Sequence, residues 1–284
     1  MKRFKVVVAA MIAIAQLWLI PGEVSLADMG NTDLDTEQNQ NLENKLLDNQ
    51  KLDIMFVLDI TGSMNGKIDK FQEQALDIML EISLDNQEAR FGMAFVADYP
   101  GQHEWQGYLG KYGTALSEPF RLVHGLDPDI YSVYETIAGI EPVDGWDAPE
   151  AYTRALYELG ELEFPEDLGG WRKDARKLVI FIGDTWTHDL SFAGMNSGGD
   201  PGRDALAGTA DDLEFCSVVQ ALEDKGIVVH AVNCDDNKYS RATMKGMSEG
   251  FERSAGTGGS YISLEDIEEL ANAIKRLIHA TILP

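Results

Sequence analysis

The chain has 284 residues, of which 44% are hydrophobic, so it is long enough to bury one large core or two small ones. Its 48 acidic and 23 basic residues give a formal net charge of −25. Because nucleic acids and anionic membranes attract positive surfaces, this charge argues against both as partners and favours solubility and cation binding.

The N-terminal segment has the pattern of a cleaved targeting sequence. Three basic residues precede an apolar stretch at residues 6–20, and small residues up to Ala27 suit cleavage. The stretch is shorter than the roughly 20 residues of a spanning helix, which favours cleavage over an uncleaved anchor. We therefore expect residues 1–27 to be a signal peptide and the mature protein to be secreted, extracellular or periplasmic, without membrane insertion. Residues 28–50 are acidic and poor in aromatics, which predicts a flexible leader.

The folded part begins near Lys51 with an apolar run at residues 52–58, typical of a strand buried on both faces of a parallel sheet. Apolar runs and amphipathic stretches then alternate to the end of the chain. The further predicted strands are 91–97, 120–124 (at a sheet edge), 177–183, 227–233 and one within 255–263. The predicted helices are 64–84, 127–140, 150–162, 211–225, 241–254 and 264–282.

This alternation predicts one α/β domain over residues 51–284. A doubly wound, mostly parallel sheet flanked by helices, a Rossmann-like three-layer α/β/α arrangement, is the natural architecture. We expect insertions near residues 98–117 and 185–211, where Gly-rich and loop-like sequence interrupts the alternation.

Oxygen-bearing side chains follow two of the buried strands. Asp59, Thr61 and Ser63 come directly after the first strand, and Asp184 follows strand 177–183. The carboxyl ends of parallel strands share one edge of the sheet, where ligands bind. Oxygens crowded there suit a hard cation such as Mg²⁺ or Ca²⁺. The alternative is that Asp59 caps the next helix while Thr61 and Ser63 satisfy its first amides.

Asp59-x-Thr61-x-Ser63 resembles the D-x-S/T-x-S motif of von Willebrand factor type A domains, where it forms the first loop of the metal-ion-dependent adhesion site. The order of elements from residue 51 to 283 is similar to the same family, and Asp184 stands where the family has the Asp of its third loop. The segment G-W-D-A-P-E-A-Y-T-R-A-L at 145–156 resembles a bacterial variant of the second loop. The resemblance implies a secreted protein of bacterial type that holds Mg²⁺, or Ca²⁺ or Mn²⁺, and binds a protein ligand through a carboxylate.

The second loop leaves its metal ligand open among Asp147, Glu150 and Thr153. Counting back from Leu156 places Glu150 where the family usually has Thr, and a carboxylate there would add negative charge at the ion. The same residues also suit a helix start, with Asp147 as cap and Glu150 in the first turn. The predicted metal-binding set is Asp59, Thr61, Ser63, Asp147, Glu150 and Asp184.

Three other features of the sequence each have two interpretations. His188 is expected to be packed or hydrogen-bonded rather than a ligand of a hard cation. Loop 196–214 has spaced carboxylates and glycines that suit a second Ca²⁺, but it lacks the Glu of an EF-hand, so a solvated acidic loop is the alternative. Cys216 and Cys234 could form one disulfide or remain two buried thiols.

An aromatic-rich region is a candidate contact surface for a partner, although aromatics in a long loop often pack against their own domain. Its members are Tyr99, His103, Trp105, Tyr108 and Tyr112.

Motifs of familiar enzymes do not occur in the sequence. There is no G-x-S-x-G, H-E-x-x-H, C-x-x-C or phosphate-binding loop. A phosphoesterase-like hydrolase with Asp59, Glu150 and Asp184 holding Mg²⁺ stays open. Phosphate chemistry needs cationic groups, and only Lys67 and Arg154 lie near these loops in sequence. We therefore expect a non-enzymatic binding module, with a domain whose ion only stabilises the fold as a further alternative.

Overall fold

The computed structural model describes residues 51–101, 113–115, 117–143, 148–162, 168–189, 192, 198–235, 237–264 and 266–282. The expected signal peptide and leader, residues 1–50, lie outside the described residues, as do parts of both expected insertions. The chain divides into two compact units, and the second, Asn44–Pro284, contains every helix and strand discussed below.

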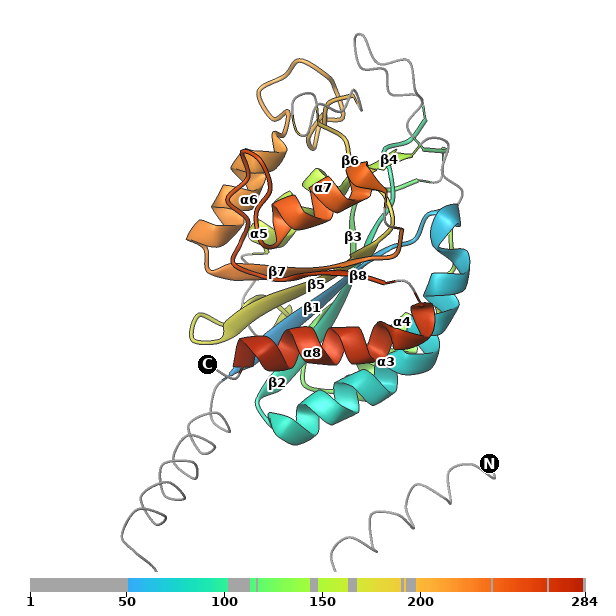
Figure 1. The fold of residues 1–284 in the computed structure, drawn as a ribbon, viewed down its shortest axis with the longest axis vertical. Coiled ribbons are helices and arrows are strands. Elements are labelled where there is room, and N and C mark those ends of the chain that lie inside the picture. Colours follow the sequence, from blue (N-terminus) through green and yellow to red (C-terminus); the bar gives the residue numbers. More distant parts are fainter. Residues whose placement is uncertain are drawn as a thin grey trace, which may run out of the picture. The chain divides into compact units, whose positions relative to one another are not determined.

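The core of this unit is a six-stranded sheet with the order β3-β2-β1-β5-β7-β8 (Figure 1). β1 (Leu52–Asp59) lies between β2 (Ala89–Val96) and β5 (Arg176–Gly183), and it is parallel to both. The edge strand β3 is antiparallel to β2, and β7 and β8 continue the parallel part. The remaining strands of the sheet are β3 (Arg121–Asp127), β7 (Ile227–Asn233) and β8 (Tyr261–Ser263). The predicted mostly parallel sheet, with residues 120–124 at an edge, is confirmed.

Helices cover both faces of the sheet, so the three-layer α/β/α prediction is also confirmed (Figure 1). One face packs against α3 (Asn65–Asp85), α4 (Ile130–Ala138) and α8 (Leu270–Ile282). The other packs against α5 (Tyr152–Gly160), α6 (Phe215–Asp224) and α7 (Lys238–Met247). The 3₁₀ turns Gly62–Met64 and Ile267–Glu269 precede α3 and α8. Among the described residues, none of the helices is both long and apolar enough to cross a membrane.

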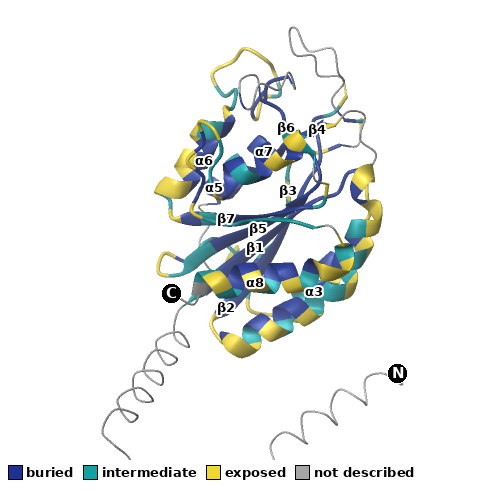
Figure 2. Cartoon of the chain, viewed as in Figure 1, coloured by how far each residue is buried: buried dark blue, intermediate teal, exposed yellow. Residues whose placement is uncertain are grey.

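The alternating side chains of β1 explain its central position. Ile54, Phe56 and Leu58 enter the core under α3 and α8, whereas Met55 and Val57 enter the core under α5 to α7. The strand is buried along its whole length, as Figure 2 shows for the centre of the sheet. A continuous apolar run is therefore what this position requires.

Most of the predicted helix bounds were wrong by several residues. Helix 211–225 spans Phe215–Asp224, helix 241–254 spans Lys238–Met247, and helix 264–282 begins at Leu270 after a 3₁₀ turn. Local contacts explain two further differences. Helix 150–162 begins at Tyr152, because Pro149–Glu150 forms a short strand, β4, parallel to β6 (Trp186–Thr187). Strands of two residues carry no periodicity, so the sequence pattern could not reveal them. Helix 127–140 begins at Ile130, where the Asp129 carboxylate accepts hydrogen bonds from the first backbone N–H groups.

A buried ion-pair cluster fixes the amino end of β1. The Asp53 side chain is fully buried, and its two oxygens accept from Arg90 Nε at 3.0 Å and Arg90 Nη2 at 2.8 Å. Arg172 adds a bond from its Nε at 2.9 Å and one from its backbone N–H at 2.8 Å. This carboxylate is therefore fully compensated by two guanidinium groups.

The two cysteines do not form a disulfide. Both are free: Cys216 packs against the core under α5 to α7, and Cys234 packs against the core under α3 and α8. Because they contact opposite faces of the sheet, both remain thiols, although they are partly rather than fully buried.

Candidate metal centre

Two carboxylates meet at the carboxyl edge of the sheet, as the sequence predicted. β1 ends at Asp59 and β5 ends one residue before Asp184. The two strands are neighbours in register, with Leu58 opposite Ile182, so both side chains emerge at the same edge. Asp59 is 0% exposed and Asp184 5% exposed.

A row of oxygens joins these carboxylates. Asp59 Oδ1 accepts from Thr61 Oγ1 at 2.6 Å and from the Thr61 N–H at 2.8 Å. Thr61 Oγ1 lies 3.4 Å from Ser63 Oγ, which donates to Asp184 Oδ1 at 3.0 Å. Thr61 is buried and Ser63 is exposed, so the row runs from the interior to the surface. We call Asp59, Thr61, Ser63 and Asp184 the oxygen row.

The oxygen row fits a hard divalent cation. Adjacent ligands around Mg²⁺, each at about 2.1 Å, are roughly 3 Å apart, and neighbouring oxygens of the row are 2.6 to 3.4 Å apart. Within the described residues there is no group of three or more His, Cys, Asp or Glu side chains placed to hold a metal ion. A cation here would therefore depend on the hydroxyls of Thr61 and Ser63 as well as the carboxylates.

Tyr152 is a member of the site that sequence reasoning missed. Its buried hydroxyl donates to Asp59 Oδ2 and accepts from the N–H groups of Asp184 at 3.3 Å and Thr185 at 3.4 Å. The ring packs edge-on against Phe181 of β5, with centroids 4.8 Å apart. This phenol thus connects the end of β1 to the end of β5. A tyrosine two residues after Glu150, in the segment expected to face the ion, was the signal available.

The electrostatics of the edge disfavour a second negative charge. Burial, and then the nearby charge of Asp184, raise the pKa of Asp59 from 3.8 to about 6, against the hydrogen bonds from Thr61 and Tyr152. Burial, followed by the charges of Asp59 and Asp184, also raises the pKa of Tyr152 well above its ordinary value, so the phenol stays protonated. Asp59 therefore lacks sufficient positive compensation, which a cation would supply.

The second predicted loop reaches the edge through its backbone. Thr185 Oγ1 donates to the carbonyl of Ala148, next to Asp184. Glu150 is buried in β4, where its carbonyl accepts from the His188 N–H at 3.1 Å. The charge of Glu150 is also among the causes that raise the pKa of Tyr152, after burial and the charges of Asp59 and Asp184.

Of the remaining second-loop candidates, Thr153 points elsewhere and Asp147 lies outside the described residues. Thr153 is buried, and its hydroxyl lies 2.7 Å from that of Thr187, in the neighbouring strand β6. The structure thus brings together Asp59, Thr61, Ser63 and Asp184 of the predicted set, and a ligand from the second loop stays a prediction.

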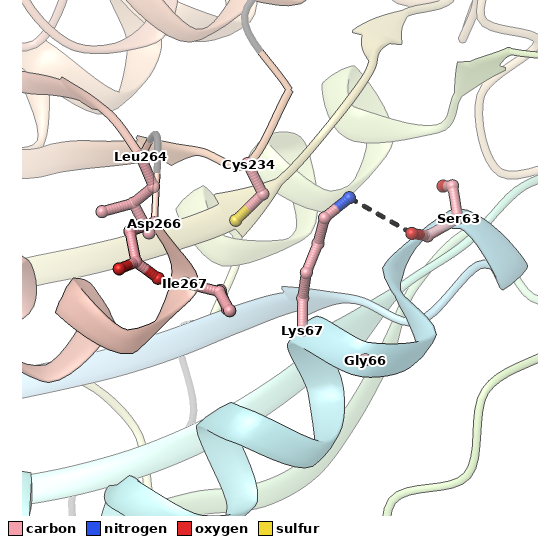
Figure 3. A pocket seen from close by; sticks show the side chains of 7 residues that line it. All are labelled: Ser63, Gly66, Lys67, Cys234, Leu264, Asp266 and Ile267. Carbon is pink, nitrogen blue, oxygen red and sulfur yellow. Dashed lines mark hydrogen bonds between the residues drawn. The ribbon is translucent and has the colours of Figure 1, made fainter.

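Lys67 supplies positive charge at the edge. Its Nζ lies 2.6 Å from Asp184 Oδ2 and 3.2 Å from the carbonyl oxygen of Ser63. Ser63 and Lys67 also line a pocket of about 450 Å³, whose other wall includes Cys234, Leu264, Asp266 and Ile267 (Figure 3). Burial raises the pKa of the Cys234 thiol to about 12, so it is an uncharged wall of that pocket.

His188 is hydrogen-bonded, as expected. Its Nε2 lies 3.0 Å from Asp98 Oδ1, and both side chains are buried.

Tyr99, proposed as a contact residue, is also buried, and its hydroxyl donates to Asp200 Oδ1 at 2.6 Å, so it is not a surface group. The other aromatics of that candidate surface, residues 103, 105, 108 and 112, lie outside the described residues.

Loop 196–214 mostly satisfies its own backbone. Asp204, Asp211 and Asp212 accept hydrogen bonds from the N–H groups of Leu206, Asp204 and Gly208, respectively. These local bonds are those of an acidic loop that caps its own backbone, and a second Ca²⁺ here stays a prediction. Asp200 is the exception, because it is fully buried against Tyr99.

No family model matches the chain, and no curated protein matches it. Three solved structures of proximal thread matrix protein 1 (PTMP1) from the mussel byssus are similar, at 14–15% sequence identity and TM-scores of 0.51–0.52. Each match covers 82% of this chain and 48% of the PTMP1 chain, so the chain corresponds to about half of that protein. One of them has a zinc-occupied MIDAS motif, the metal-ion-dependent adhesion site. At this identity the similarity shows the fold alone, a von Willebrand factor type A-like α/β fold.

Proposed function

We propose that this protein is a non-enzymatic binding module that holds a divalent cation on the oxygen row and uses it to bind a carboxylate of a protein ligand. The observation that carries the proposal is the continuous row from buried Asp59 to exposed Ser63. Its buried end anchors the cation, and its exposed end leaves room for an oxygen from outside. Mg²⁺ is the proposed ion, with Mn²⁺ and Ca²⁺ as alternatives.

The residues of the oxygen row would bind the cation, and Tyr152 would keep two of them in position. Asp59 and Asp184 supply negative charge, while Thr61 and Ser63 would turn their hydroxyl lone pairs toward the ion. Tyr152 holds Asp59 and the backbone of Asp184 in place, which preorganises the edge. When bound, the cation would supply the positive charge that attracts a ligand carboxylate. Because residues 1–27 have signal-peptide character, we also propose that the protein is secreted.

Metal binding is tested first, by calorimetric titration with Mg²⁺, Mn²⁺, Ca²⁺ and Zn²⁺. The test variant is Ser63→Ala, and Ser217→Ala is the matched control, because both serines are exposed and Ser217 donates to the exposed Glu214. We expect Ser63→Ala to weaken binding at least tenfold and Ser217→Ala to leave it unchanged. Equal binding by both variants would show that the oxygen row is not the site.

Ligand binding is tested on immobilised peptides that contain Asp or Glu, with matched Asn or Gln peptides, in Mg²⁺ and in EDTA. We expect retention on acidic peptides only, and only with Mg²⁺ present. Metal binding without such retention would favour the alternative in which the ion stabilises the fold. Turnover of phosphate or ester substrates by the native protein, absent from Asp59→Ala, would favour the hydrolase.

A further inference from the structure

Lys67 donates a hydrogen bond to one oxygen of Asp184, a carboxylate that the proposed cation would use. Asp184 Oδ1 accepts from Ser63 Oγ, and Asp184 Oδ2 accepts from the Lys67 ammonium at 2.6 Å. The Asp184 side chain is 5% exposed and that of Lys67 is 24% exposed, so this ion pair is largely shielded from water. A charge-assisted bond in such surroundings is stronger than an ion pair on the open surface.

The start of α3 sets this contact. Lys67 lies four residues after Ser63, and residues at this spacing share a face of a helix. The carbonyl of Ser63 accepts a second bond from the same ammonium at 3.2 Å, which Figure 3 shows as a dashed line. One short segment therefore presents both a hydroxyl and an ammonium to Asp184.

We propose that Lys67 is a resident cation of the centre, which a divalent ion must displace from Asp184, and that it thereby sets how tightly the centre binds metal. This inference rests on the proposed function. An ion bound to Asp184 would lie within a few ångströms of the ammonium, where like charges repel strongly. The pocket beside Lys67 gives the displaced side chain a place to go, and the carboxylate of Asp266 lines the same pocket.

Lys70 provides a matched control on the same helix. It lies one turn further along α3, and its ammonium pairs with Glu73 at 3.2 Å and Glu268 at 2.5 Å. Both of these carboxylates are mostly exposed, at 68% and 65%. Removing the charge of Lys70 therefore reports the long-range effect of one positive charge, without release of Asp184.

The affinity test compares Mg²⁺ and Mn²⁺ titrations of the native protein with Lys67→Met, Lys67→Arg and Lys70→Met. We expect Lys67→Met to bind roughly ten- to a hundredfold more tightly, the worth of one charge-assisted hydrogen bond. Lys67→Arg keeps the cation and should stay within about threefold of native, and Lys70→Met should stay within about twofold. A Lys67→Met affinity equal to that of Lys70→Met would overturn the proposal.

Displacement itself is tested by lysine acetylation read by mass spectrometry, with and without saturating Mg²⁺. We expect Mg²⁺ to raise the acetylation rate of Lys67 severalfold and to leave that of Lys70 unchanged. An unchanged or slower rate at Lys67 would overturn displacement, even where metal binds. If the native protein binds no metal but Lys67→Met does, the inference is supported. If neither binds, the proposed function fails with it.

Discussion

The substitution Asp59→Asn should stabilise the protein when divalent cations are chelated. In EDTA at pH 7.5 the native carboxylate is ionised and buried beside Asp184, whereas the carboxamide of the variant would carry no charge at the same place. The rise in the pKa of Asp59 from 3.8 to about 6 corresponds to about 3 kcal/mol of destabilisation by the ionised form. The carboxamide nitrogen cannot accept the hydrogen bond of the Tyr152 hydroxyl, and this loss offsets about 1 kcal/mol or more. We therefore expect the free energy of unfolding to rise by up to about 2 kcal/mol in the variant.

The stability gained by Asp59→Asn should depend on pH, because only the ionised form of Asp59 is destabilising. An acid whose pKa is higher in the folded state costs nothing below pH 4, where it is protonated in both states. Its cost grows between about pH 4 and 6 and stays constant above pH 6. The advantage of Asp59→Asn should therefore be complete at pH 7.5, shrink through that window, and vanish near pH 4.

Urea unfolding in EDTA, followed by circular dichroism at several pH values, measures this difference. Asp53→Asn is the matched control, since Asp53 lies in the same strand and is equally buried but is bonded to Arg90 and Arg172. It should lose about 3–5 kcal/mol, because two guanidinium groups are left uncompensated. Added Mg²⁺ should stabilise the native protein and not Asp59→Asn. A variant that is less stable than native at pH 7.5 in EDTA would refute the reasoning.

Three other changes test the surroundings of the centre by urea unfolding. Tyr152→Phe should cost about 1–3 kcal/mol at pH 7.5, because Asp59 Oδ2 loses its donor, and equal stability would mean that the bond is dispensable. Gly183→Ala should cost a similar amount, since its Cβ would lie 2.4 Å from the Tyr152 hydroxyl oxygen, and the cost should fall in a Tyr152→Phe background. Burial lowers the pKa of His230 from 6.5 to about 4, so stability should drop by up to about 3 kcal/mol as pH falls through that window. His230→Gln should flatten this drop.

Much of the fold follows from sequence because its central strands are continuous apolar runs. Residues 52–58 and 177–183 are recognisable for that reason, and their ends place Asp59 and Asp184 at one edge. Contacts between distant segments could not be predicted in the same way. The pairing of β4 with β6 and the reach of Tyr152 to Asp59 depend on how loops fold back over the edge. The bond between Lys67 and Asp184 is of the same kind, although the sequence did single out Lys67 as one of two cations near the loops.

The pKa of Asp59 illustrates why residue types alone leave the chemistry undetermined. The motif gives a carboxylate followed by two hydroxyls, and the same letters also suit a helix cap. Only the surroundings decide: the Thr61 N–H does bond Asp59, and burial beside Asp184 also leaves the carboxylate short of positive charge. For Asp147, which lies outside the described residues, the choice of second-loop ligand stays a prediction.

The two ends of β1 each carry a buried carboxylate, but in opposite electrostatic surroundings. At its first residues Asp53 is clamped by Arg90 and Arg172, while at its last Asp59 faces another acid. The anchoring of the strand and the proposed attraction of a cation therefore depend on separate carboxylates, at opposite ends of the strand. Substitutions around Asp59, which alter the proposed centre, should therefore leave the ion pairs of Asp53 with Arg90 and Arg172 intact.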